Sequence, residues 1–425
     1  MKGLEEQAGS SRPVTFALNR SFGFFWLGQT ISTLGSQVSA FAIPLLAAIS
    51  LHASPQQMGF LKGAEFFPFL LFTLPAGVWA DLGIRRRMMI VTNLMQGSVI
   101  LLVPLSVALG LMRLEVLYLV MFAMGSLKVV FEMSYQTYVP ELVGREALVN
   151  ANSKIMMSYA LGQSCGPGFA GILVEFLGAP LAVFADSFGF FLCALCIFKI
   201  KHCEIRRAPQ PLLPQIAEGF RYVAGQPYIR SLLCLLSASN FFMNALITLL
   251  VLYATRVLEI RPGVFGAIVS VGGLGAITGA SVAQRIGTRL GPGPFMIAGV
   301  GTCGLAALIF PAVGSGQQIG ISFLAFAYFL LSACGSSNTV YAWTIRQYLT
   351  PPELLGKMNG AFRFCVTGVM PFGAFFGGLL GEWIGIRETL IVIGIGFIAS
   401  AVICWFFSPL RGLKNLVPVP SRVAA

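Results

Sequence analysis

The sequence places six ionisable side chains inside long apolar runs, where a charge is costly and usually has a task. They are Lys62, Glu65, Lys128, Glu132, Asp186 and Arg363. Burial favours the neutral form of a carboxyl group, whereas a nearby lysine favours its charged form, so a carboxyl subject to both can take up and release a proton. We therefore predict that Glu65 and Asp186 are the candidate proton-coupling groups.

The same residues also allow a purely structural interpretation. Lys62 and Glu65 are one helical turn apart, and Lys128 and Glu132 stand at positions i and i+4. At these spacings opposite charges can form a permanent ion pair along one helix face. Besides Glu65, which would pair with Lys62, the candidate members of ion pairs within the apolar runs are Lys62, Lys128, Glu132 and Arg363. The sequence leaves both interpretations open.

The composition indicates what surrounds these charges. Hydrophobic residues make up 56% of the 425 residues, and charged residues make up only 10%, whereas a soluble domain spends about a quarter of its residues on charge. A chain so poor in charge cannot cover itself with a water-compatible surface, and its exterior needs lipid as solvent. We expect an all-α integral membrane protein in contact with the lipid bilayer.

Composition and motifs also bear on cofactors and partners. The net charge of +12 would suit nucleic acid, but the charges lie in short gaps between apolar runs, so no nucleic acid is expected. No G-x-x-x-x-G-K-[ST] loop occurs, which argues against nucleotide binding. The two histidines, His52 and His202, stand in no metal motif. We therefore expect no metal site, no cofactor and no catalytic residue.

Twelve apolar runs are long enough to cross a membrane as helices, which takes about 20 residues each. They fall at roughly 22–50, 55–80, 88–110, 115–138, 152–176, 180–199, 228–255, 263–284, 292–312, 318–344, 358–382 and 388–408. A polar segment separates them into two groups of six. The predicted divisions are an N-terminal tail (1–21), an N-terminal six-helix bundle (22–200), a central loop (201–227), a C-terminal six-helix bundle (228–408) and a C-terminal tail (409–425).

The positive charges predict the orientation. Of the 28 Lys and Arg residues, 21 fall in the tails, in the central loop and in alternate connections. The other connections hold only Arg113, Arg256, Arg261 and Arg387. Because cytoplasmic segments carry the excess of Lys and Arg, both termini are predicted to be cytoplasmic.

The central loop carries apolar residues at helical spacing, namely Ile216, Phe220 and Val223. This pattern predicts a short amphipathic helix. The helix could lie on the cytoplasmic membrane surface or serve as a solvated linker, and the sequence does not separate these alternatives.

A shift of 207 residues superimposes parts of the two halves. It places Asn152 on Asn359, Gly166 on Gly373, Gly171 on Gly378, Glu175 on Glu382 and Gly178 on Gly385. The fifth and eleventh spans therefore look like copies, and their glycines would allow close helix approach. Duplicated halves of this kind commonly hold a substrate site at their interface and rock against each other. We predict two pseudo-symmetric bundles.

A charged loop joins the second and third spans. It reads Gly77-Val-Trp-Ala-Asp81-Leu-Gly-Ile-Arg85-Arg86-Arg87. Gly77 would allow close helix approach, and the arginines could pair with Asp81, so that the loop latches two helices in one conformational state. The arginines could instead be only positive-inside anchors.

This loop resembles the signature loop of the major facilitator superfamily through Gly77, Asp81, Arg85 and Arg86. It departs from that signature at Leu82, where the family usually has arginine, so the latch would be weaker. The fifth span resembles the glycine-proline motif of the family's antiporters, although Ser153 replaces its upstream glycine. The matching residues are Gly162, Gly166, Pro167, Gly168 and Gly171.

The first span resembles a narrower group, the bacterial exporter branch that includes enterobactin exporters and macrolide efflux proteins. The matching residues include Trp26, Gly28, Gln29, Gly35 and Pro44. The resemblance implies the major facilitator fold and a monomeric, non-enzymatic transporter of the bacterial inner membrane. It also implies proton-coupled efflux, by alternating access, of a small amphipathic compound of drug, macrolide or siderophore type. An importer of a small metabolite is the alternative, followed by a non-transporting membrane protein.

Overall fold

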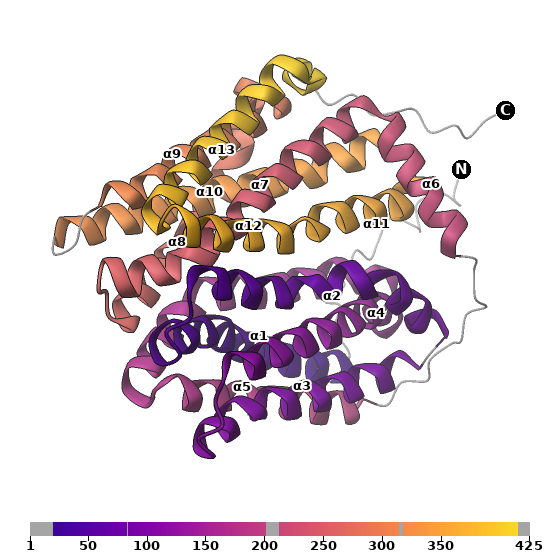
Figure 1. Cartoon of the computed structure of the whole chain (residues 1–425). Helices are drawn as coiled ribbons and strands as arrows, with labels where there is room; N and C mark the ends of the chain where they lie inside the picture. The colour runs from indigo at the N-terminus through magenta and orange to yellow at the C-terminus, as the bar shows by residue number, and fades with distance from the viewer. Residues whose placement is uncertain (1–19, 83, 201–211, 314–317, 415–425) are drawn as a thin grey trace, which may run out of the picture.

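The computed structural model describes residues 20–82, 84–200, 212–313 and 318–414, and within these ranges it contains helices and no strands (Figure 1). Helices are expected here because in lipid a helix satisfies its backbone polar groups within its own segment. The predicted all-α class is thus confirmed. Most of both tails, and the first part of the predicted central loop, lie outside the described residues.

The N-terminal bundle is built from the following elements. They are α1 (Arg20–Leu45), a π-helical turn η1 (Leu46–Ser50), α2 (Pro55–Leu82), α3 (Arg85–Ala108), α4 (Leu114–Leu177) and α5 (Ala179–Phe198). Helix α4 comprises two of the predicted spans, because Gly144 inside it has a non-helical backbone with φ +74°. Glycine adopts this conformation without a steric penalty. We call residues 114–144 the first arm of α4 and residues 145–177 its second arm.

The C-terminal bundle repeats this plan. Its elements are α7 (Pro227–Leu252), a second π-helical turn η2 (Tyr253–Val257), α8 (Pro262–Leu290), α9 (Pro292–Ala312), α10 (Gln318–Leu349), α11 (Pro352–Gly368), α12 (Met370–Trp383), α13 (Ile386–Phe407) and a short 3-10 turn η3 (Pro409–Gly412). Helices α11 and α12 form one span with a break at Val369. The break precedes Pro371, whose ring and missing N–H disrupt the helical ladder.

Ten stretches of the described residues are long and apolar enough to cross a membrane, and they coincide with ten of the twelve predicted runs. The other two runs correspond to α2 and to the second arm of α4. Helix α2 has 28 residues, about 42 Å of helix, which exceeds the ~30 Å hydrocarbon core of a bilayer. Large apolar side chains also remain on the exterior, such as Phe407, which is 86% exposed. The chain is a multi-pass membrane protein.

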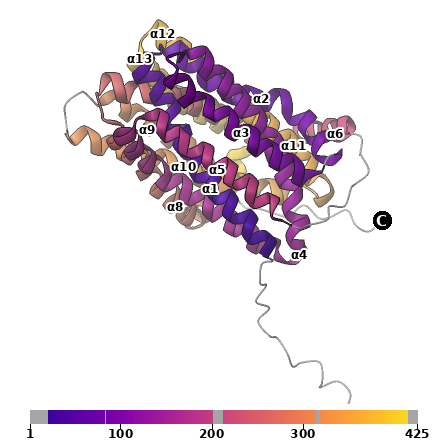
Figure 2. The same ribbon diagram turned by 90° about the horizontal axis from the view of Figure 1, so that it is seen from below.

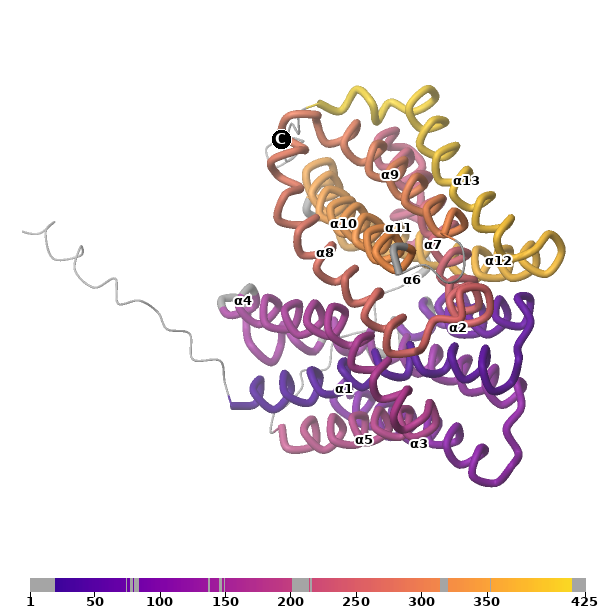
Figure 3. Tube along the Cα trace, turned by 90° about the vertical axis from the view of Figure 1, so that its left-hand side faces the viewer, coloured from indigo at the N-terminus to yellow at the C-terminus, as the bar shows by residue number. Residues whose placement is uncertain are grey.

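The two bundles lie one against the other, the N-terminal one in indigo to magenta and the C-terminal one in rose through orange to yellow (Figures 1 and 3). Within the N-terminal bundle α5 packs against both α1 and α3, and these three helices run side by side when the bundle is seen from below (Figure 2). Between the bundles, α4 packs against α8 and α2 packs against α12. Two helices of each bundle therefore contact the other bundle, and the two helix pairs lie on opposite sides of the interface.

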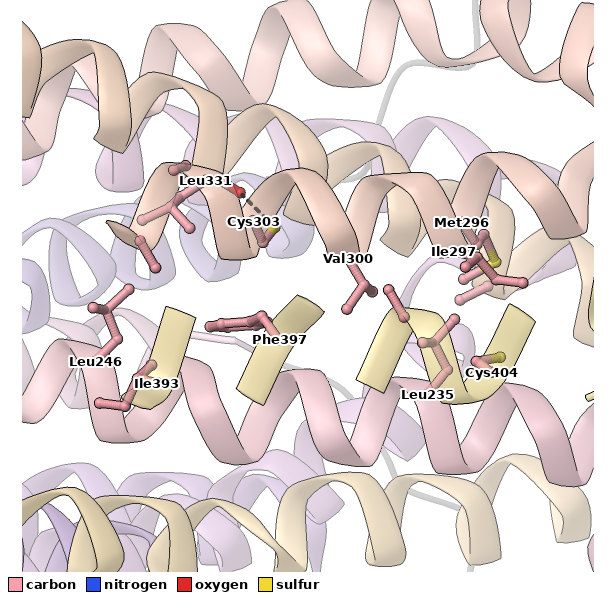
Figure 4. Packing of buried hydrophobic residues seen from close by; sticks show 14 of the residues in the cluster. Leu235, Leu246, Met296, Ile297, Val300, Cys303, Leu331, Ile393, Phe397 and Cys404 are labelled. Carbon is pink, nitrogen blue, oxygen red and sulfur yellow. Dashed lines mark hydrogen bonds between the residues drawn. The ribbon is translucent and has the colours of Figure 1, made fainter. Parts of the chain in front are cut away.

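Each bundle has its own apolar core. In the C-terminal bundle the core lies between α7, α9 and α13, where Leu246, Val300 and Phe397 are buried (Figure 4). Lipid tails are as apolar as these side chains, so burial away from lipid gives little driving force. The cores are held instead by the many short-range dispersion contacts of close packing.

Matching features recur 207 residues apart, as the sequence repeat predicts. The π-helical turns η1 and η2 begin at Leu46 and Tyr253. Each turn is followed by a non-glycine residue with positive φ, His52 or Glu259. In each half the next helix then starts at a proline, which is Pro55 in α2 and Pro262 in α8. The halves are therefore pseudo-symmetric in backbone conformation as well as in sequence.

The predicted amphipathic helix forms as α6 (Leu212–Gly225), and it packs against α11 of the C-terminal bundle. Its Glu218 accepts a hydrogen bond from Lys357 Nζ at 2.6 Å. Phe220 meets the ring of Phe364 edge-on, and Val223 is buried. The apolar side of α6 is thus covered by protein.

We predict that Gly144→Ala destabilises the protein, because any side chain at φ +74° strains the backbone at a cost of about 1 kcal/mol. The free energy of unfolding in detergent measures this effect. Gly23→Ala is the matched control, since Gly23 is helical and a Cβ there would meet no atom within 4 Å. Equal stability of the two variants would contradict the role assigned to the Gly144 backbone.

Candidate functional site

The charged residues of α2 and α4 lie where the two bundles meet. Lys62 Nζ and Glu65 Oε2 are 2.6 Å apart on α2, and both side chains are 18% exposed. The Lys62 ammonium also lies 5.3 Å from the centre of the Phe66 ring, within cation–π range. Gly125 of α4 packs on the Glu65 backbone, so the first arm of α4 approaches α2 at this pair.

Glu132 forms an ion pair with Arg363 of α11, in the opposite bundle. The candidate pairing of Glu132 with Lys128 along α4 is therefore replaced by a contact between the bundles. Arg363 is 43% exposed and Glu132 is 24% exposed. This ion pair links the two bundles, and both of its side chains remain partly exposed.

Lys128 is exposed, and within the described residues it makes no hydrogen bond or ion pair. Gly125, one helical turn before Lys128, packs on the Glu65 backbone, so Lys128 lies on the side of α4 that approaches this pair. Lys62, Glu65, Lys128, Glu132 and Arg363 thus form one group, which we call the central charge cluster.

Asp186 lies apart from this cluster. Its side chain is fully buried, and it packs against Gly35 of α1. Neither carboxyl oxygen of Asp186 accepts or donates a hydrogen bond among the described residues. Ser36 and Ser39 of α1 are close by. An ionised carboxylate without partners is very costly to bury, so the geometry suits the protonated form of Asp186.

The arginines after α2 bind helices of their own bundle. Arg85 is 2% exposed, and its Nη1 lies 2.5 Å from Glu141 Oε1 of α4. Arg86 donates to the backbone oxygen of Phe198 at 2.6 Å, at the end of α5. The backbones of Gly77 and Asp81 belong to α2, but the surroundings of Gly77 and the side chain of Asp81 lie outside what the structure describes. Glu141 was not among the predicted site residues, although it stands in the Pro-Glu-Leu run that recurs at 352–354.

We call the end of the bundles at which η1 and η2 lie the far end. From the middle of the span toward that end, glycines of the second arm of α4 face two helices. Gly162 and Gly166 pack on Thr33 and Gln37 of α1. Two further glycines, Gly168 and Gly171, pack on α8, and the Gly168 N–H donates to Ser270 Oγ at 2.8 Å. Because glycine has no side chain, the backbones of α4 and α8 approach closely.

The contact of Gly171 with α8 is repeated by symmetry on the other side of the interface. A Cβ on Gly171 would lie 3.1 Å from Gly266 Cα, and one on Gly378 would lie 2.8 Å from Gly59 Cα. The carbonyl of Pro167 also faces Gly266, and Gly373 faces the Phe241 backbone in α7. The contacts of Pro167 and Gly171 with Gly266 join α4 to α8, and that of Gly378 with Gly59 joins α12 to α2. We call these contacts between the bundles the two glycine seams.

Each seam ends in a glutamate that caps a helix of the opposite bundle. Glu175 Oε2 accepts a hydrogen bond from the backbone N–H of Gly263 at 3.0 Å, in the first turn of α8. Glu382 Oε2 accepts from the N–H of Gln56 at 3.3 Å, in the first turn of α2. A carboxylate is favourable at a helix N-terminus, where free N–H groups and the helix dipole point at it. The four residues are related by the shift of 207, so the caps are a crossed pair.

Two helical bundles that meet in paired glycine seams around internal charges define a membrane transporter with duplicated halves. Sequence comparison agrees, because the profile of the family described as transmembrane secretion effector matches residues 13–422. The chain belongs to this family of the major facilitator superfamily. Such transporters bind small-molecule substrates within the membrane.

The chain is similar to two efflux proteins along most of its length. One is the multidrug efflux pump Tap of Mycolicibacterium fortuitum, 26% identical over 402 residues, which are 89% of this chain and 93% of Tap. The other is the enterobactin exporter EntS of Shigella flexneri, 26% identical over 373 residues, which are 84% of this chain and 85% of EntS. The predicted resemblance to exporters of the superfamily is confirmed.

The fold is also similar to that of a bacterial homologue of the human lysosomal transporter Spinster, in an inward-facing and unoccupied conformation. The TM-score is 0.75 at 14% sequence identity, over 97% of this chain and 100% of the other. At this identity the likeness shows the shared fold alone.

We predict that Arg85→Met lowers the free energy of unfolding by about 3 kcal/mol, because it leaves the largely buried Glu141 carboxylate without this partner. Unfolding in detergent, followed by circular dichroism, measures the loss. Arg87→Met is the control: Arg87 is exposed, and its replacement should change stability by no more than about 0.5 kcal/mol. Similar losses in both variants would mean that Arg85 is only one more basic anchor.

Proposed function

We propose that this protein exports a small amphipathic compound, of drug, macrolide or siderophore type, across the bacterial inner membrane in exchange for protons. The observation that carries the proposal is the arrangement of the interface. Two glycine seams and two crossed caps join the bundles at the far end, and the central charge cluster lies between the same bundles. We take the far end as periplasmic and both termini as cytoplasmic, in keeping with the Lys and Arg distribution.

This arrangement supports a mechanism of alternating access. With the far end joined, a substrate would enter between the bundles from the cytoplasmic end. Separation of the glycine seams, together with the two caps, would open the far end and release it. The Glu132–Arg363 ion pair crosses the interface, so it would break and re-form as the bundles rock.

Glu65 is our first candidate for proton exchange. In this conformation it is paired with Lys62, and protonation of the carboxylate would release the lysine. The pair can therefore respond to a proton, provided that water reaches its 18% exposed side chains. Asp186 is the second candidate, because its buried carboxyl suits the protonated form in this conformation. Arg85 and Arg86, with Gly77 and Asp81, would stabilise one conformational state as a latch.

The substrate class and direction rest on the relatives, whose printed functions are multidrug efflux and enterobactin export. Everted membrane vesicles with an acidic interior test both. Proton-driven accumulation of at least one compound from a panel of siderophores, macrolides and dyes is expected. Accumulation of none would contradict export, and proton-dependent uptake into intact cells would support the importer instead.

We predict that Glu65→Gln lowers proton-driven accumulation in these vesicles by at least about tenfold, because the amide cannot exchange a proton. Glu218→Gln is the matched control, since Glu218 is half exposed and lies on α6. Asp186→Asn is assayed in parallel as the competing candidate. Full proton-driven transport by the Glu65→Gln protein would remove Glu65 as the coupling residue.

We predict that the double substitution Glu175→Gln and Glu382→Gln opens the far end. Each cap loses a charge-assisted hydrogen bond, and the two losses together should shift the population toward the open state by about tenfold or more. Spin labels at positions 111 and 257, which are exposed at this end on opposite bundles, should report a longer distance in a cysteine-free background.

Glu115→Gln is the control for this experiment. Glu115 is also an exposed glutamate at the far end, but among the described residues it caps no helix of the opposite bundle. An unchanged distance distribution in the double variant would show that the glycine seams alone keep the far end closed.

A further inference from the structure

The charges of the central charge cluster do not balance. Three cationic side chains, Lys62, Lys128 and Arg363, face two carboxylates. Both carboxylates are already engaged, Glu65 with Lys62 and Glu132 with Arg363. The other mid-span carboxyl of the described chain, Asp186, is buried against α1 and is not joined to the cluster by a hydrogen bond or ion pair. One positive charge, that of Lys128, is therefore left over.

The position of Lys128 on α4 indicates where this charge points. Leu119 is 65% exposed and lies nine residues earlier, which at about 100° per residue is half a turn around the helix. Leu119 thus marks the lipid-facing side of the first arm, and Lys128 is on the opposite side. Gly125, which packs on α2, and Glu132, which pairs with α11, lie one turn on either side of Lys128. Lys128 therefore faces the interface between the bundles.

An ammonium group in this place is expensive to keep without an anion. The middle of a membrane-spanning segment is the position at which a lysine costs most, and such a residue usually has a partner or lines a water-filled path. Lys128 is exposed and has no partner within the described residues. Arg363, the member of this cluster that lies on the opposite bundle, is 43% exposed even while it is paired. Both groups can therefore reach a ligand between the bundles.

We infer that the transported compound is an organic anion, and that Lys128 binds its negative group with Arg363 on the opposite side. This inference rests on the proposed transport function and adds the charge of the substrate to it. The Phe66 ring beside Lys62 supplies an apolar surface at the same depth, so the substrate combines an acidic group with an apolar or aromatic body. A carboxylate or phenolate compound has this chemistry. A permanent cation would meet the unpaired charge of Lys128 and be disfavoured.

A matched pair of dyes tests the inference by binding. Fluorescein is an anion, and a rhodamine ester with the same xanthene rings is a cation, so the two differ mainly in charge. Fluorescence anisotropy with the purified full-length protein in detergent gives both affinities. We expect the wild type to prefer fluorescein, and Lys128→Met to weaken fluorescein binding by about tenfold or more. Lys128→Arg should retain fluorescein binding, and Lys128→Glu should reverse the preference between the dyes.

Controls separate charge recognition from a loss of structure. Lys199→Met removes an exposed lysine directly after α5 and should leave both affinities unchanged. Melting temperature and elution volume should match the wild type in every variant that is compared. Equal binding of fluorescein by the wild type and Lys128→Met would overturn the inference, as would a wild-type preference for the rhodamine ester or an absence of fluorescein binding.

Transport in everted vesicles separates this inference from the proposed function. Proton-driven accumulation of the rhodamine ester without fluorescein would leave efflux standing and overturn the anionic substrate. Fluorescein binding that depends on Lys128, without transport of any compound in the panel, would contradict efflux and support Lys128 as an anion-binding residue. A uniform loss of binding for both dyes in Lys128→Met would mean that the lysine has only a structural role, and would also overturn the inference.

Discussion

The structure depends on one constraint, which is that lipid does not drive helices together. Apolar side chains gain little by leaving lipid tails for a protein core, so the bundles must be joined by backbones that approach closely and by polar contacts. The glycine seams meet this need, because a Cβ at Gly171 or Gly378 would press against the facing helix. The two caps add a carboxylate to the helix N-terminus at the end of each seam. Both kinds of contact depend on proximity, so both are lost together when the helices separate.

The same surroundings govern the charges. In a medium of low dielectric constant an unpaired charge is costly, so a buried charge usually has an oppositely charged partner close by. Within the described spans, Glu65 and Glu132 are paired, Arg85 is buried against Glu141, and Asp186 is enclosed without a partner. Lys128 stands out because it has neither enclosure nor a partner among the described residues. In this conformation two ion pairs engage four of the five charges of the central charge cluster, and Lys128 is the fifth.

The sequence predicts most of the fold. Span length and glycine spacing can be read within a single helix, and the shift of 207 residues can be read by comparing one half of the chain with the other. It does not predict partners that lie on different helices. Glu132 pairs with Arg363, 231 residues away, and the spacing along α4 suggests Lys128 instead. Glu175 and Glu382 bind backbone N–H groups, which any residue type other than proline provides, so no side-chain pattern marks those sites. The packing of α6 on α11 likewise depends on where the C-terminal bundle places α11.

The two halves share the contacts of the seams but differ in their charged residues. The shift of 207 that carries Pro55 and Gly59 onto Pro262 and Gly266 carries Lys62 and Glu65 onto Val269 and Gly272. Duplication has thus kept the contacts that hold the halves together but has not kept the ionic pair of α2. Two copies of the N-terminal half could rebuild both seams with their caps, yet they would lack Arg363 and would double the charges of α2 and α4. The second half is therefore the less charged side of the interface between the bundles, and it contributes Arg363 to that interface.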